Sequence, residues 1–171
     1  MSEVDRIADA EMQQSNVGTR SAAERVPFFV PHLRPGMSVL ECGCGVGSIT
    51  RDLAARVAPE PVVGIDVGEG QLAVARSEAD RRDPNNVRFD LANAHELPFA
   101  EGSFDAVLAH TLLVHLRDPA QVLRALRRVL KPGGVACVSD DETRELNPGK
   151  SPLGERVRNT AGGSRDKWRT P

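Results

Sequence analysis

Three glycines at alternate positions form the clearest candidate for a ligand-binding turn in this 171-residue chain. Gly43, Gly45 and Gly47 belong to residues 39–47, Val-Leu-Glu-Cys-Gly-Cys-Gly-Val-Gly, in which a short apolar run meets an acid. A turn without side chains lets backbone N–H groups approach a ligand, and the positive end of a following helix favours anionic groups there. A dinucleotide fingerprint needs a third glycine where this chain has Ser48, so the turn differs from that fingerprint.

Two carboxylates lie close to this turn in the predicted arrangement. Asp66 follows an apolar run about twenty residues after the glycines. Its two oxygens could accept hydrogen bonds from both hydroxyls of a ribose, although the same position also suits a helix N-cap. Glu41 directly precedes the turn. It either satisfies turn N–H groups as a buried acid or lies near a cationic group of a ligand.

The elements that would position these residues alternate between strand and helix from about residue 37 to residue 139. This alternation predicts an α/β fold, a Rossmann-like, doubly wound, mainly parallel sheet with helices on both faces. We expect strands at Met37–Glu41, Val62–Ile65, Val87–Phe89, Phe104–Ala109 and Val135–Ser139. We expect helices at Ser48–Val57, at Gly70–Arg82 and from Pro119 to a stop at Lys131-Pro132-Gly133-Gly134.

The carboxyl ends of parallel strands meet at one edge of such a sheet, where ligands bind. Asn93, Ala94 and His95 follow the third predicted strand, and His110 ends the fourth. The sequence therefore predicts that these residues gather with the glycine turn and Asp66.

Composition narrows the classes of partner. The net charge is −2, so the chain has no basic footprint for nucleic acid. The first residues are polar and no apolar run reaches 18 residues, so we expect a cytoplasmic protein without membrane insertion. Cys42 and Cys44 lack a second ligand pair at suitable spacing, so we expect no metal and interpret them as small thiols filling a tight turn.

Five ordered segments give the chain a family resemblance. They are the glycine turn, Gly-Ile-Asp (64–66), Ala-His-Glu-Leu-Pro-Phe (94–99), Gly-Ser-Phe-Asp-Ala-Val (102–107) and Leu-Lys-Pro-Gly-Gly (130–134). Together they resemble the class I S-adenosylmethionine-dependent methyltransferases, in the branch that contains the ubiquinone and menaquinone methyltransferases. The resemblance covers about a hundred residues and implies S-adenosyl-L-methionine as the cofactor.

The resemblance also assigns roles to residues at the sheet edge. Gly43, Gly45 and Gly47, with Cys44 between them and Glu41 before them, would face the methionine part of the cofactor. Asp66 would hold the ribose, and Val67 would lie against the adenine. The family commonly has Asp where this chain has Asn93, whose carbonyl would accept from the adenine amino group, while Ala94 would offer its N–H to the ring. The cofactor-binding residues implied are therefore Glu41, Gly43, Cys44, Gly45, Gly47, Asp66, Val67, Asn93, Ala94 and His110.

The reaction implied is an in-line displacement that moves a methyl group to a small-molecule acceptor. Alignment and exclusion of water would do most of the work, because the cofactor already carries an activated methyl group. A base is needed only if the acceptor atom carries a proton, and His110 and His115 are the candidates. The resemblance would place His110 beside the methionine and the reacting methyl group. For His115, the structural alternative is a partly buried residue at the start of the loop before Asp118.

Both ends of the chain depart from this pattern. We expect an N-terminal helical segment (1–36), a methyltransferase core (37–146) and a loosely packed or disordered tail (147–171). The antiparallel strand pair that completes the sheet in full members of the family would be missing. The strand around residues 135–139 would then be an exposed edge, able to pair with a second copy or with a partner chain.

Two other functions compete with small-molecule methyl transfer. One is a shortened, non-catalytic subunit that binds S-adenosylmethionine or S-adenosylhomocysteine for a partner. The other is a nicotinamide-dependent oxidoreductase, which Ser48 and the Leu-Pro-Phe and Lys-Pro-Gly-Gly segments disfavour.

Overall fold

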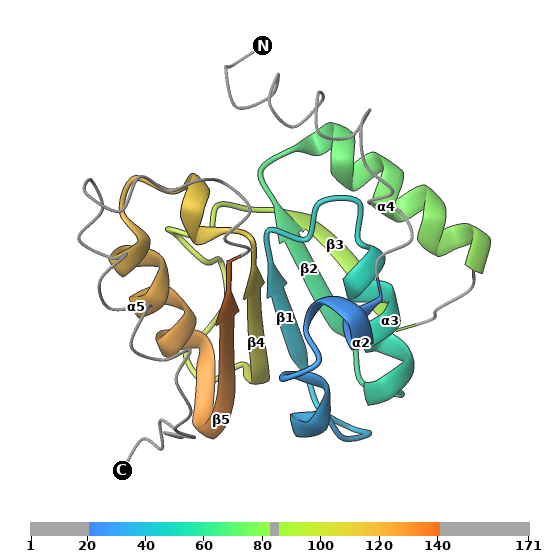
Figure 1. The fold of residues 1–171 in the computed structure, drawn as a ribbon, viewed down its shortest axis with the longest axis horizontal. Helices are drawn as coiled ribbons and strands as arrows, with labels where there is room; N and C mark the ends of the chain where they lie inside the picture. The colour runs from blue at the N-terminus through green and yellow to red at the C-terminus, as the bar shows by residue number, and fades with distance from the viewer. Residues whose placement is uncertain (1–20, 83–85, 141–171) are drawn as a thin grey trace.

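A computed structural model describes residues 21–82 and 86–140, which fold into a five-stranded parallel sheet (Figure 1). The strand order is β3-β2-β1-β4-β5, and every neighbouring pair is parallel. The strands are β1 (Val39–Cys42), β2 (Val62–Asp66), β3 (Val87–Leu91), β4 (Phe104–His110) and β5 (Leu130–Ser139). The helices are α2 (Ala22–Arg25), α3 (Ser48–Val57), α4 (Glu69–Arg82) and α5 (Pro119–Val129), with 3-10 turns η2 (Val30–His32) and η3 (Leu113–His115).

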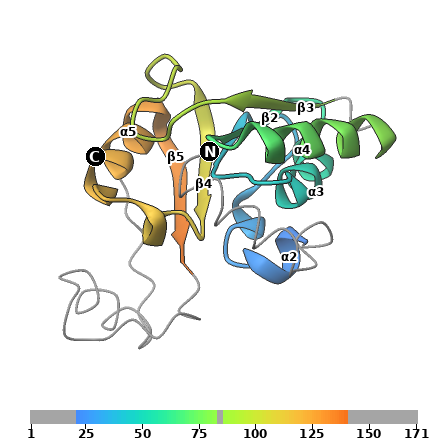
Figure 2. The ribbon, with the colours of Figure 1, turned by 90° about the horizontal axis from the view of Figure 1, so that it is seen from above.

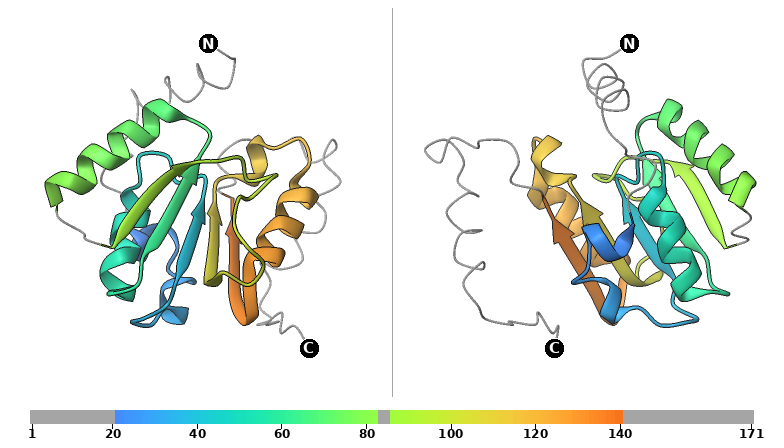
Figure 3. Two further views of the ribbon diagram at one scale, coloured as in Figure 1. Left: turned by 180° about the vertical axis from the view of Figure 1, so that it is seen from behind. Right: turned by 45° about the vertical axis from the view of Figure 1, so that its right-hand side comes forward.

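Helices cover both faces of this sheet, as the view from above shows (Figure 2). The short α2 and the longer α3 and α4 lie on one face, and α5 lies on the other (Figure 3). The predicted doubly wound α/β fold is therefore confirmed. The prediction that the C-terminal strand pair is missing, and that of a loosely packed tail from residue 147, both concern residues outside the described ones. Residues 1–20 of the predicted N-terminal segment also lie outside them.

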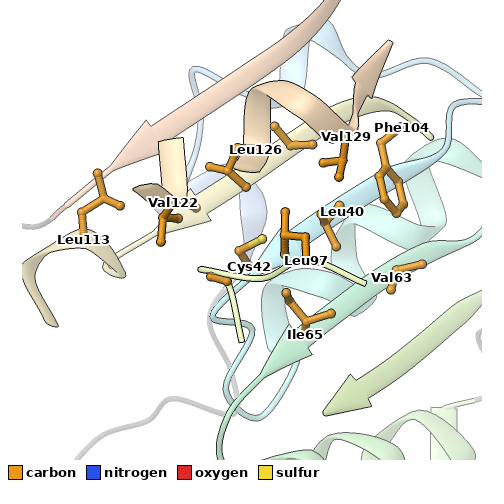
Figure 4. Close-up of a cluster of buried hydrophobic side chains, with 13 residues drawn as sticks. Leu40, Cys42, Val63, Ile65, Leu97, Phe104, Leu113, Val122, Leu126 and Val129 are labelled. Atoms are coloured by element: carbon orange, nitrogen blue, oxygen red, sulfur yellow. The ribbon is translucent and has the colours of Figure 1, made fainter. Parts of the chain in front are cut away.

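The core on the α5 face joins residues that are far apart in the sequence (Figure 4). Leu40 of β1, Val63 and Ile65 of β2 and the α5 residues Val122 and Leu126 are all buried there. Leu97, from the loop after β3, closes the same cluster, so burying the apolar stripe of α5 also positions this loop.

The N-terminal segment packs on the opposite face. The Ser21 hydroxyl accepts from the Glu24 N–H at 3.3 Å and so caps the start of α2. Val26 and Phe29 are fully buried against α3 and the sheet. A hydrogen bond of 2.7 Å from the Ala22 N–H to Asp52 Oδ2 ties α2 to α3.

One predicted boundary is wrong. The Lys-Pro-Gly-Gly segment was expected to separate α5 from a strand beginning at Val135, but β5 begins at Leu130. Phe104 pairs with Leu130 and Ala106 pairs with Val135, so residues 131–134 form a bulge within the strand. Gly134 permits this bulge because a Cβ there would come 2.8 Å from the Asp105 carbonyl oxygen.

β5 is one edge of the described sheet, as predicted, and the exposed fraction of Val138 is 37%. Within 21–82 and 86–140, we find no helix with the length and apolar character needed to cross a bilayer.

Candidate functional site

A hollow of about 70 Å³ opens at the carboxyl ends of β1, β2 and β3. Such an edge is the usual ligand position in a doubly wound sheet. Five predicted site residues line the hollow, namely Gly43, Asp66, Val67, Asn93 and Ala94. The structure thus brings together residues from three separate loops that sequence analysis had grouped.

The glycine turn adopts the backbone conformation that its composition predicts. Gly43, Gly45 and Gly47 have φ values of 76°, 53° and 69°, in a backbone region that residues with a side chain rarely adopt. A Cβ on Gly47 would overlap the Phe89 ring, so this glycine serves packing. No described atom lies within 4 Å of a Cβ built on Gly45, so this glycine leaves open space.

Asp66 links the turn after β1 to the turn after β2. Its Oδ2 accepts from the Gly45 N–H at 2.8 Å, and its Oδ1 accepts from the Gly68 N–H at 2.9 Å, just before α4 begins. The bond to Gly68 closes an Asx turn, and Gly68, whose carbonyl accepts from the Leu72 N–H, takes the cap position of α4, so the N-cap alternative for Asp66 is wrong. Each carboxylate oxygen retains a further lone pair, so these bonds orient the group and leave acceptors for a diol.

Glu41 is a buried acid, with 3% of its surface exposed. Its Oε2 accepts from the Thr50 hydroxyl, in the first turn of α3, at 2.6 Å. The pKa of Glu41 is raised to about 8 as the net result of four effects: burial raises it most, the Thr50 hydrogen bond lowers it, the negative charge of Asp66 raises it and the positive charge of Arg51 lowers it. Its partner is thus a side-chain hydroxyl and not the turn N–H groups named in one of the two alternatives, and Glu41 does not line the hollow.

Cys42 and Cys44 are buried thiols, which confirms their interpretation as packing residues. Burial raises the pKa of both thiols, so both stay protonated at neutral pH. The Cys44 side chain belongs to a cluster with Leu72 and Phe89 under α4, and not to the hollow. Its predicted cofactor contact would therefore come from its backbone.

The two candidate bases differ in their surroundings. His110 is buried at the end of β4, and its Nδ1 lies 3.1 Å from the Thr111 hydroxyl. His115 ends η3 and is exposed, so the expectation that it is partly buried is wrong. An apolar loop places it there, because Leu113 takes the buried position of that turn.

The loop after β4 is held by the end of β5. Thr111 has a φ of 53°, which is unusual for a β-branched residue, and its N–H donates to the Ser139 carbonyl at 2.7 Å. The Leu113 N–H donates to Asp140 Oδ1 at 3.1 Å. These two bonds fix the loop that carries Leu112 into the wall of the hollow.

Four residues of the hollow were not predicted: Ile65, Ala92, Leu112 and Leu116. All four are apolar and lie within two residues of a strand end or on the turn that follows β4. The sequence marks these four residues only by their position near strand ends, because an apolar residue at such a position is as typical of the hydrophobic core as of a ligand site.

Comparison with known proteins gives a consistent set of likenesses. A family model described as a methyltransferase domain matches residues 33–162. Demethylmenaquinone methyltransferase from Lactococcus lactis is 40% identical over 105 residues, covering 60% of this chain and 42% of the relative. The chain spans less than half the length of the curated relatives that it matches first.

Two solved structures extend the comparison. The [4+2]-cyclase SpnF is 32% identical with a TM-score of 0.60, covering 78% of this chain and 43% of SpnF. Phosphoethanolamine N-methyltransferase 2 from Haemonchus contortus, in complex with S-adenosyl-L-methionine, is 26% identical with a TM-score of 0.63. That alignment covers 67% of this chain and 27% of the other.

Proposed function

Because this chain belongs to the class I S-adenosylmethionine-dependent methyltransferases, in the branch of the quinone methyltransferases, we propose that it transfers a methyl group to a small molecule. The observation that carries the proposal is the hollow, where Gly43, Asp66 and Asn93 meet from three loops. The cofactor, S-adenosyl-L-methionine, would lie in this hollow, and it supplies an electrophilic methyl group on a sulfonium.

The order of the strands supports this placement. The loops after β1, β2 and β3 follow one another along the sheet edge in that order. A ligand with its ribose at Asp66 would then extend its amino-acid part toward Gly43 and its base toward Ala94. Val67, 58% exposed, offers an apolar surface for the face of the base. The open space at Gly45 fits a ligand that approaches the backbone closely.

The chain contributes alignment more than bond-making groups in this proposal. Two backbone N–H groups orient Asp66 before any ligand binds, so the free energy of binding includes little entropy cost for ordering this side chain. A well-aligned acceptor can gain an effective molarity of about 10⁵–10⁸ M, which suffices for an in-line displacement. For an acceptor that carries a proton, we propose His110 before His115 as the base, since His110 ends β4 at the edge where the hollow lies.

Calorimetric titration with S-adenosyl-L-methionine tests the cofactor site. Asp66→Ala removes the diol acceptor and should weaken binding by about 1.5–3 kcal/mol, the usual range for a hydrogen bond to a charged group. Asp90→Ala is the matched control, because Asp90 is an acid of the neighbouring β3 that pairs with Arg88 at 2.9 Å on the surface. Equal affinity of the Asp66 variant and the wild type would refute the ribose role.

The likeness to a protein named as a [4+2]-cyclase places a similar fold in a protein whose name does not describe methyl transfer. This favours one alternative, a shortened subunit that would bind the cofactor without transferring its methyl group. An assay with methyl-labelled cofactor and a panel of quinone and polyketide-like acceptors separates the two functions. Label in an acceptor supports the methyltransferase. The alternative is supported if the chain binds the cofactor but labels no acceptor in the panel, while a known methyltransferase of this branch, run as a positive control, labels an acceptor in the same panel.

A further inference from the structure

The base end of the hollow contains an asparagine whose side chain is already engaged. Asn93 Oδ1 accepts from the His95 backbone N–H at 3.0 Å, and the His95 ring Nδ1 lies 3.0 Å from the same oxygen. Asn93 itself lines the hollow and is exposed to it.

These two contacts determine which way the amide faces. A backbone N–H can only donate, so the atom that it meets must be the amide oxygen and not the NH₂ group. An oxygen can only accept, so the His95 Nδ1 must carry a proton. Both lone pairs of Oδ1 are then used, and the NH₂ group is the part of this side chain that remains for a ligand.

The surrounding loop is held in place by α5. The Gln121 side-chain amide donates to the His95 carbonyl at 3.3 Å. The Arg128 guanidinium donates to the carbonyls of Leu97 and Phe99, both at 2.7 Å. Asn93 therefore belongs to a loop that α5 anchors at His95 and at two residues after it, and the Asn93 amide orientation is set before a ligand binds.

We propose that Asn93, locked by His95, presents an N–H donor to the base and so relaxes the discrimination between 6-amino and 6-oxo purines. This rests on the proposed function, which places the base beside Asn93 and Ala94. The carbonyl acceptor that the family resemblance suggested for the adenine amino group is occupied by His95.

The hydrogen-bonding groups of the two purines explain the expected balance. Adenine has a donor at position 6, which meets the Asn93 NH₂ poorly, and an acceptor at N1, which suits the Ala94 N–H. A 6-oxo purine has an acceptor at position 6, which suits the Asn93 NH₂, and a donor at N1, which meets the Ala94 N–H poorly. Each base gains one match and suffers one mismatch, so their affinities should be similar.

The test is calorimetric titration of the full chain with S-adenosylhomocysteine and with its 6-oxo counterpart, S-inosylhomocysteine. We expect the wild type to bind both within about threefold, since neither base satisfies every group. Asn93→Asp should favour the adenosyl compound by about tenfold or more, because its carboxylate accepts from the amino group and repels the 6-oxo oxygen.

A second variant isolates the contribution of His95. His95→Ala removes one of the two contacts that lock the Asn93 amide, so the amide can turn its carbonyl toward the 6-amino group; adenosyl affinity should rise several-fold while inosyl affinity stays constant. A preference of the wild type for the adenosyl compound by more than about tenfold would overturn the inference, because a ratio of that size corresponds to one additional satisfied hydrogen bond. An equal ratio in wild type and Asn93→Asp would also overturn it. Failure of the wild type to bind either compound would refute the proposed function itself, and this inference with it.

Discussion

Replacing Glu41 by glutamine should remove most of the pH dependence of stability that this chain shows near neutrality. Glu41 is buried, and its pKa is raised from 4.5 to about 8. Glutamine has nearly the same shape and can still accept from the Thr50 hydroxyl, which lies 2.6 Å from Glu41 Oε2. The variant therefore changes the ionisation and leaves the packing and this hydrogen bond in place.

The sign follows from proton binding. Between pH 4.5 and about pH 8, the folded protein holds a proton on Glu41 that the unfolded chain has released. Stability that depends on this proton is fully present below pH 4.5 and is lost as the pH rises through the folded pKa. One pKa unit corresponds to about 1.36 kcal/mol, so the wild type should lose about 3–4 kcal/mol of unfolding free energy between pH 5 and pH 8 from this group.

Urea unfolding of both proteins at half-unit pH intervals measures this quantity. The difference between wild type and variant is the relevant observable, because the other titrating groups contribute equally to both. We expect the variant to gain on the wild type steadily from pH 5 to pH 8. A difference that stays constant over this range, or that changes in the opposite direction, would refute the assignment of Glu41 as a protonated buried acid.

Two further predictions concern the glycine turn and Asp105 at the start of β4. Gly47→Ala should destabilise the protein by about 2–4 kcal/mol in urea unfolding, because the new Cβ would overlap the Phe89 ring and the backbone φ is 69°. At Gly45 a Cβ meets open space, so Gly45→Ala should cost about 1 kcal/mol, from its backbone φ alone. Equal losses of stability in the two variants would contradict this difference. Partial burial raises the pKa of Asp105, but hydrogen bonds from Lys131 and Ser38 lower it more, to below 3.8. Asp105→Asn should therefore lose about 1 kcal/mol at pH 7 and less as the pH falls below 4, and a thermal unfolding series that finds the same loss at pH 3 would exclude this explanation.

The positions of the strands and of the glycine turn could be predicted because local rules and tertiary packing agree there. Helix α3 begins and ends at the predicted residues, since its glycine turn and apolar stripe give consistent signals. The start of β5 was mispredicted because a proline and two glycines usually end an element. Here the bulge opposite Asp105 accommodates them, and only the pairing partner β4 reveals it.

The sequence was sufficient to predict which loops form the site. It was not sufficient to predict which atoms face the ligand, because their orientation depends on side-chain hydrogen bonds between different loops or within one turn. The bond from Gly45 to Asp66 and the double contact of His95 with Asn93 have no periodic signature in the sequence. The exposure of His115 depends on which side of a 3-10 turn packs inward, which one residue of register decides.

The bonds that join the loop after β4 to the end of β5 make the sheet edge and the hollow thermodynamically linked. Leu112, in the wall of the hollow, lies between Thr111 and Leu113, whose N–H groups donate to Ser139 and to Asp140. A molecule seated against Leu112 would favour the conformation in which both bonds exist, and so would order the last residues of β5. By reciprocity, any chain that pairs with the side of β5 that has no partner strand among the described residues, and so fixes the last residues of β5, would raise affinity in the hollow by the same factor.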